Sequence, residues 1–148
     1  MIKINTYSEK NIPSDDIKKE IVNFLFESLE QYGDPKDDIE KAIDYAFGKD
    51  QKPGGVVLSA HDSESGKIAG AVVVNKTGMA SYIPENILVY IATDKDLRGK
   101  GVGKQLMQTA IDATEGDVAL HCEPDNPAKF LYEKRGFTSK YLEMRLKK

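Results

Sequence analysis

The stretch ILVYIATDKDLRGKGVG, residues 87–103, decides the fold, because a short apolar run passes through charged residues to three closely spaced glycines. Its first five residues are aliphatic or aromatic and too few for a typical helix, so they predict a mostly buried strand. From Gln105 the apolar residues recur at helical spacing until Gly116, which predicts a helix. The glycines therefore lie in a loop that joins a strand to a helix.

This loop, Arg98 to Gly103, has the features of an anion-binding site. Its glycines let a ligand approach the backbone, and the first N–H groups of the following helix have no partner inside that helix. Those N–H groups and the helix dipole favour negative charge, and the basic side chains of Arg98, Lys100 and Lys104 add to the effect. The structural alternative is a tight turn whose glycines serve only the backbone.

Spacing excludes two common nucleotide-binding motifs. A Walker loop needs Ser or Thr after Gly-Lys, but Gln105 follows Gly103-Lys104, and Arg98 stands where the earlier glycine belongs. A dinucleotide fingerprint starting at either of the first two glycines of the loop would require a further glycine where the chain has Lys or Leu. The loop therefore predicts an anion site of another kind.

The length predicts a single domain over residues 1–148, and the lack of a recognisable targeting or membrane-spanning segment predicts that it is cytoplasmic. A formal net charge of −3 argues against a nucleic-acid partner but allows a local basic pocket for a phosphate-bearing cofactor. No apolar run approaches the roughly 18 residues of a membrane span, and the start of the chain lacks a signal-peptide core. Cys122 is the single cysteine, and the two histidines stand isolated, so neither a disulfide nor a metal site is expected.

Periodicity along the rest of the chain predicts the order β-α-α-β-β-β-α-β-α-β, an α/β fold with a mixed sheet and helices packed on its faces. The predicted strands cover residues 3–7, 56–60, 67–75, 87–91, 118–123 and 137–146. The predicted helices cover residues 14–29, 39–46, 105–115 and 128–135.

Two motifs stand in a fixed order in the second half of the chain. The first is Arg98-x-x-Gly101-x-Gly103, directly after a strand, and the second is VxLxCxxxNxAxxLYxKxGF over residues 118–137. Together they resemble the GNAT superfamily of acyl-CoA-dependent N-acyltransferases, over residues 67–148. The resemblance implies a central mixed sheet flanked by helices in one acetyltransferase domain.

The resemblance also implies roles for individual residues. Asn126 would hydrogen-bond the pantetheine arm of coenzyme A, the strand edge at Ala92 and Thr93 would pair with its amides, and Tyr132 would lie near its sulfur. An amine would attack the thioester directly, and the Tyr132 hydroxyl would protonate the departing thiolate, so Cys122 is not needed as a nucleophile. The pyrophosphate of the cofactor would be held by Arg98, Gly99, Lys100, Gly101, Val102, Gly103 and Lys104.

One departure from the family concerns the general base. Several relatives place a Glu or His on the central strand, eleven or nine residues before the Arg or Gln of the first motif. Those positions here are Ile87 and Val89, which cannot accept a proton. Glu85 and His61 are candidates from nearby segments, and an ordered water leading to bulk solvent is a third option.

We therefore expect an N-acetyltransferase that moves an acetyl group from acetyl-CoA to the primary amine of a small molecule or peptide. A catalytically silent coenzyme A-binding regulatory module is the first alternative, because the strand base is missing. An α/β phosphate- or nucleotide-binding protein is the second, although it leaves the 126–137 segment unexplained. A homodimer is compatible with either class, and the sequence does not identify the acceptor.

Overall fold

The computed structural model describes residues 1–148, and its five strands form one sheet in the order β1-β2-β3-β4-β5. Neighbours from β1 to β4 are antiparallel, and β5 lies parallel to β4. The strands are β1 (Ile2–Tyr7), β2 (Gly55–Asp62), β3 (Ile68–Lys76), β4 (Asn86–Thr93) and β5 (Val118–Leu120). The helices are α1 (Asp15–Leu29), α2 (Lys36–Ala46), α3 (Val102–Asp112) and α4 (Lys129–Lys134), with short 3-10 helices at Glu30–Tyr32, Lys49–Gln51 and Lys95–Leu97.

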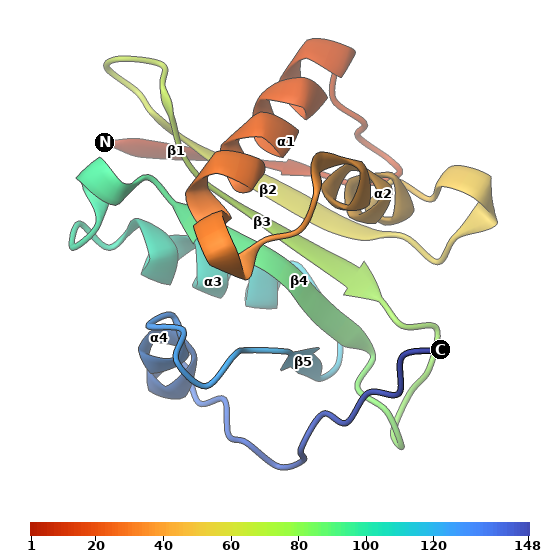
Figure 1. Ribbon diagram of the computed structural model, residues 1–148. Coiled ribbons are helices and arrows are strands. Elements are labelled where there is room, and N and C mark those ends of the chain that lie inside the picture. The colour runs from red at the N-terminus through yellow and green to blue at the C-terminus, as the bar shows by residue number, and fades with distance from the viewer.

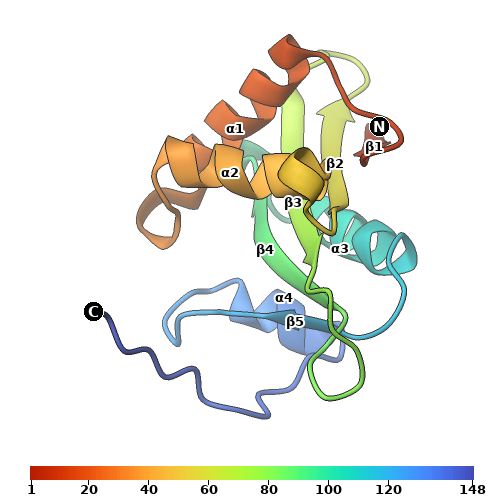
Figure 2. The same ribbon diagram turned by 90° about the vertical axis from the view of Figure 1, so that its right-hand side faces the viewer.

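Helices cover both faces of the sheet, as Figures 1 and 2 show. Helices α1 and α2 pack on one face with Val57 and Val73, and α3 and the Tyr132 side chain of α4 pack on the other with Leu58 and Val72. Successive side chains of a strand point to opposite faces, so a strand buried on both sides is apolar throughout, as β3 is from residues 71 to 74. The fold class expected from the sequence, a mixed α/β sheet flanked by helices, is confirmed.

Strand β4 leaves its neighbour β5 soon after the two strands pair. The parallel pairing covers only Asn86 to Leu88, and Figure 1 shows the two strands diverging beyond it. At the same point β4 contains a bulge, because Val74 pairs with Leu88 and Val73 with Tyr90, which leaves Val89 without a partner on β3. From Val89 onward, β4 therefore has no neighbouring strand on its β5 side.

The predicted closing strands at residues 137–146 are wrong. The chain after Phe137 forms no strand, and four apolar side chains in it are 80–88 % exposed, those of Tyr141, Leu142, Met144 and Leu146. An alternating pattern makes a strand only where a sheet edge pairs with it, and β5, with three residues, offers few backbone groups. The strand predicted over residues 118–123 covers only Val118–Leu120 in the structure. The helix predicted from Gln105 begins one turn earlier, at Val102.

No helix of the structure combines the length and the apolar character needed to cross a membrane.

The position of α3 depends on a glycine in β3. A Cβ on Gly70 would lie 2.6 Å from Cδ1 of Leu106, 3.1 Å from the carbonyl oxygen of Ala92 and 3.3 Å from Cγ1 of Val102. We therefore expect Gly70→Ala to lower the free energy of unfolding by about 1–3 kcal/mol, because the added methyl group overpacks the contact between α3 and the sheet. Denaturant unfolding would measure this, with Thr138→Ala in the exposed C-terminal segment as the unchanged control. A Gly70→Ala protein as stable as the wild type would contradict this packing.

Candidate active site

The glycine loop follows β4 and leads into α3. Gly99 has φ +83° and Gly101, the N-cap of α3, has φ +80°, values in the left-handed region that side chains disfavour. A Cβ built on either glycine would meet no protein atom within 4 Å. The two glycines therefore shape the backbone and leave open space beside it.

The backbone donors of this loop have no protein partner. No N–H group from Gly99 to Lys104 donates a hydrogen bond inside the protein, and the last of these groups form the N-terminus of α3. Arg98, Lys100 and Lys104 are exposed and take part in no ion pair. The loop therefore offers unpaired donors and positive charge to an anion such as a pyrophosphate.

Gly103 has a different role from the other two glycines. Its φ is not in the left-handed region, and a Cβ on it would lie 3.4 Å from Cδ2 of Leu131 and 3.6 Å from Cγ2 of Thr93. The first turn of α3 thus approaches both α4 and the end of β4. A small residue here keeps the glycine loop close to α4, which carries Tyr132, and to the end of β4, which carries Ala92 and Thr93.

The edge of β4 beyond the bulge provides further unpaired backbone. Ala92 and Thr93 pair with Ala71 and Gly70 of β3 on one side, and no strand pairs with β4 there on the other. An extended ligand with amide groups can add to such an edge through main-chain hydrogen bonds. This arrangement supports the predicted contact between Ala92, Thr93 and a pantetheine arm, which stays a prediction.

Asn126 caps the turn that leads into α4. Its Oδ1 accepts a hydrogen bond from the N–H group of Ala128 at 2.9 Å, whereas its Nδ2 group has no partner in the protein. The cap fixes the side chain and leaves two N–H donors free. The predicted hydrogen bond from Asn126 to the cofactor is therefore compatible with its capping role.

Tyr132 lies in the core between α4 and the sheet, with 8 % of its surface exposed. Its ring contacts that of Phe137 edge to face at 6.1 Å, and its hydroxyl has no hydrogen-bond partner in the protein. Burial raises the pKa of Tyr132 to about 12, with a smaller contribution from Cys122, and burial also raises the pKa of the Cys122 thiol. Both groups are therefore protonated near neutral pH, so Tyr132 has a proton that it can donate and Cys122 is a poor nucleophile.

The two side chains predicted as alternative bases both have structural partners. Glu85 precedes β4, at the end opposite the glycine loop, and its Oε1 accepts a hydrogen bond from the N–H group of Asp117 at 3.1 Å. That hydrogen bond holds the pKa of Glu85 below its usual value. His61 lies on β2, and its Nε2 is 3.0 Å from Oε1 of Glu20. A role as general base stays a prediction for both.

The structure adds two hydrogen bonds that the sequence analysis did not predict. The Tyr90 hydroxyl of β4 donates to Oδ2 of Asp34 at 2.6 Å, and the Tyr32 hydroxyl donates to the carbonyl oxygen of Asp125 at 3.2 Å. The paired residues are 56 and 93 positions apart in the chain, so no local motif signals these contacts. Beyond Leu88, β4 and the chain that continues from β5 are no longer paired, and we call the space between them the opening. The two hydrogen bonds connect the segment between α1 and α2 with both sides of this opening.

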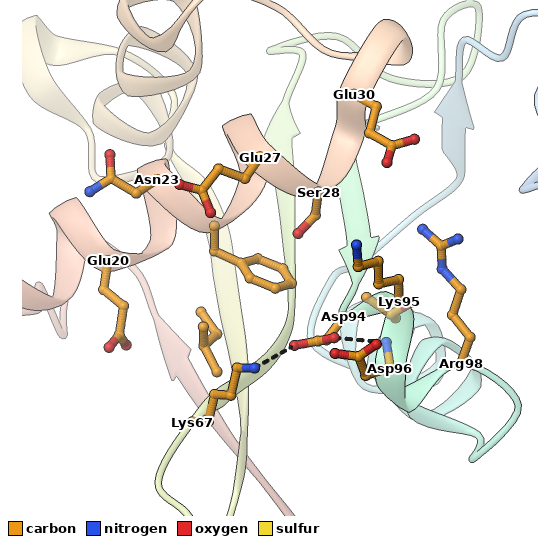
Figure 3. A pocket seen from close by; sticks show the side chains of 13 residues that line it. Glu20, Asn23, Glu27, Ser28, Glu30, Lys67, Asp94, Lys95, Asp96 and Arg98 are labelled. Carbon is orange, nitrogen blue, oxygen red and sulfur yellow. Dashed lines mark hydrogen bonds and ion pairs between the residues drawn. The ribbon is translucent and has the colours of Figure 1, made fainter.

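A polar pocket of about 470 Å³ lies between α1 and the segment that follows β4 (Figure 3). Carboxylates approach it from both walls, and Arg98 of the glycine loop extends along its border. Asp94 is held in place by Lys67 at 3.5 Å and by the N–H group of Asp96 at 2.8 Å. The charged residues of the pocket are Glu20, Glu27, Glu30, Asp94, Asp96, Lys67, Lys95 and Arg98.

A mixed sheet that opens beside an anion-binding loop is the arrangement that the two sequence motifs imply. The sequence matches the model of the acetyltransferase (GNAT) family over residues 19–137, and the chain therefore belongs to this family. The resemblance inferred from the motifs is thus confirmed. The family match favours acetyl transfer over the second alternative, a phosphate- or nucleotide-binding protein of another family. Members of the family generally use acetyl-CoA as the donor.

Solved structures share the fold at low sequence identity. Ribosomal-protein-S18-alanine N-acetyltransferase from Escherichia coli has a TM-score of 0.70 and 16 % identity, covering 95 % of this chain and 80 % of that one. PH1933 from Pyrococcus horikoshii OT3 has a TM-score of 0.68 and 25 % identity, covering 97 % and 93 %. Glucosamine-6-phosphate N-acetyltransferase from Arabidopsis thaliana has a TM-score of 0.61 and 21 % identity, covering 99 % and 98 %. No curated protein matches the sequence.

The raised pKa of Tyr132 makes stability depend on pH. Because the folded state favours the neutral phenol, the unfolded chain loses this proton first as the pH rises above about 10, and the free energy of unfolding falls until the folded pKa is passed. Between pH 9 and pH 11 the wild type should lose about 1 kcal/mol more stability than Tyr132→Phe. Denaturant unfolding at the two pH values measures the difference, and equal losses in both proteins would contradict the burial of the hydroxyl.

Proposed function

We propose that the protein transfers an acetyl group from acetyl-CoA to the primary amine of a small molecule or a peptide, by direct attack of the amine. The observation that supports this most is the set of N–H groups from Gly99 to Lys104, which have no acceptor in the protein and lie at the N-terminus of a helix in a member of the GNAT family. A loop that served only to turn the chain would not need so many free donors together.

The residues of the loop fit the pyrophosphate of coenzyme A. The open space at Gly99 and Gly101 accommodates a ligand against the backbone, and three exposed cations complement its charge. We place the pantetheine arm along the unpaired edge of β4 at Ala92 and Thr93, with the free Nδ2 group of Asn126 as a further donor. When bound, acetyl-CoA supplies a thioester whose carbonyl carbon accepts the amine.

The overall change needs one proton donor and one proton acceptor. The neutral amine nitrogen forms a bond to the carbonyl carbon, the carbon–sulfur bond breaks with its electron pair on sulfur, and the nitrogen gives up one proton to the acceptor while the sulfur takes one from the donor. An acceptor that arrives as an ammonium ion first loses a further proton to water. Tyr132, protonated near neutral pH, donates to the sulfur and is reprotonated by solvent. Since Ile87 and Val89 cannot accept a proton, we propose that the amine loses its proton to water, with Glu85 or His61 as alternatives.

The absence of a base on β4 also favours a second candidate, a catalytically silent module that binds coenzyme A and regulates a partner. The two functions differ in turnover. A free-thiol release assay over a panel of primary amines, with acetyl-CoA and succinyl-CoA as donors, separates them. Release that depends on an amine supports the transferase, whereas coenzyme A binding without release supports the module.

The compartment and the partners of the protein belong to the same proposal. We propose that the protein acts in the cytoplasm on a dissolved amine, alone or as a homodimer. The formal charge of −3 disfavours a nucleic-acid partner, because the phosphate backbone requires an extended basic surface.

Replacing Gly101 by valine tests the cofactor site. The side chain would enter the space proposed for the pyrophosphate, so we expect coenzyme A affinity to fall at least about tenfold, a loss of roughly 1.4 kcal/mol. Gly66→Val in the turn between β2 and β3 is a matched control, because Gly66 has φ +72° and also has no protein atom within 4 Å of a Cβ. Both variants should lose about 1–2 kcal/mol of stability from the left-handed backbone. Titration calorimetry that finds wild-type affinity in folded Gly101→Val would refute the proposed site.

Removing the Tyr132 hydroxyl tests the proton donor. Tyr132→Phe keeps the ring against Phe137, so coenzyme A affinity should stay within about threefold of wild type. The rate of the chemical step should fall at least about tenfold, since general acids contribute roughly 10²–10⁴-fold. Single-turnover thiol release measures this rate, with Tyr82→Phe, which removes an exposed hydroxyl, as the control. An unchanged chemical step in Tyr132→Phe would assign the proton donor elsewhere.

A further inference from the structure

The segment between α1 and α2 spans the opening between β4 and the loop that follows β5. On one side the Asp34 carboxylate accepts a hydrogen bond from Tyr90 of β4, and on the other the Tyr32 hydroxyl donates to the carbonyl oxygen of Asp125. In Figure 1 this turn lies in front of β4. The segment therefore borders the space in which the proposed thioester and its acceptor would meet.

The hydrogen bond between Tyr90 and Asp34 fixes a carboxylate beside the bulge of β4. Tyr90 directly follows Val89, and only 7 % of its surface is exposed. Burial, together with the hydrogen bond to Asp34, holds the pKa of Tyr90 well above its usual value, so the neutral phenol acts as the donor. The position of Asp34 is thus determined by a rigid strand rather than by its own loop.

One oxygen of the Asp34 side chain has no partner in the protein. The residue is exposed, it takes part in no ion pair, and only its Oδ2 oxygen accepts a hydrogen bond. The next cation along the chain, Lys36, lies over the ring of Phe26 at 5.1 Å instead. A carboxylate that is anchored through one oxygen and free at the other can accept a charge-assisted hydrogen bond from an ammonium group.

We infer that Asp34 binds the positively charged amino group of the acceptor and holds it in front of the β4 bulge, where the nitrogen gives up one proton to solvent before it attacks the thioester. This inference rests on the proposed transfer to a primary amine and narrows it to amines that are cationic near neutral pH. Ile87 and Val89 of β4 offer no charge to such a group, so the anion comes from the segment between the helices. Asp34 is then a specificity-determining residue, and Tyr90 is the positioning residue that holds it.

Two isosteric variants separate this role from a purely structural one. Asp34→Asn removes the charge, but its side-chain oxygen can still accept the hydrogen bond from Tyr90. Tyr90→Phe removes the hydrogen bond and keeps the charge. If the Asp34 carboxylate only stabilises its loop, Tyr90→Phe should lower the free energy of unfolding and Asp34→Asn should leave the affinity for amines nearly unchanged. Asp37→Asn, an exposed carboxylate on the first turn of α2, controls for net charge.

The experiment measures binding of 1,4-diaminobutane by NMR titration, following the backbone amides of Asp34, Val89 and Tyr90, with 1,4-butanediol as the uncharged probe. We expect saturable shifts with the diamine alone, affinity at least about tenfold weaker in Asp34→Asn, an intermediate loss in Tyr90→Phe, and values within about twofold of wild type in Asp37→Asn. In the transfer assay, Asp34→Asn should raise the KM of a cationic acceptor more than it lowers kcat.

Equal affinity in Asp34→Asn and wild type, equal binding of the diol and the diamine, or the absence of shifts at these amides would each overturn the inference. The titration is run both with and without coenzyme A. Failure of coenzyme A to bind while the diamine binds through Asp34 would therefore count against the proposed function and not against the amine site.

Discussion

The pairing of β4 with β5 stops at Leu88, and the rest of the site depends on this interruption. The bulge at Val89 inserts one residue into β4 and bends the strand, so its edge beyond the bulge has no neighbour. Backbone groups that a closed sheet would pair internally thus stay available to a ligand. An open edge within a sheet is costly unless something covers it, and a bound extended cofactor would do so.

The rigidity of the opening comes from the layers on both faces of the sheet. Strand β3 is buried against α1 and α2 on one side and against α3 on the other, so β4 pairs with a strand that is packed on both faces. Two glycines bring α3 close: Gly70 lets the helix pack on the sheet, and Gly103 lets its first turn approach α4 and the end of β4. The anion-binding N-terminus is therefore positioned by close packing as well as by its loop.

Side chains of opposite charge without an ion-pair partner lie at two places around the opening. The loop after β4 carries three exposed cations beside unpaired N–H groups, whereas the segment between the first two helices presents the Asp34 carboxylate. This separation suits two reactants of opposite charge, since a phosphate-bearing donor and a cationic acceptor would be attracted to different sides of the same opening. Tyr132, neutral and buried, lies in the core under α4.

The sequence by itself determined the order of the helices and strands up to residue 136, the glycine loop and the family, because hydrophobic period, glycine spacing and short motifs are local properties. Only the tertiary structure decided that residues 137–146 stay unpaired, since a strand needs an edge as well as a pattern. It also decided the contacts of Asp34 with Tyr90 and of Tyr32 with Asp125. Those contacts join residues far apart in the chain, and only packing of the helices on the sheet brings them within hydrogen-bond distance.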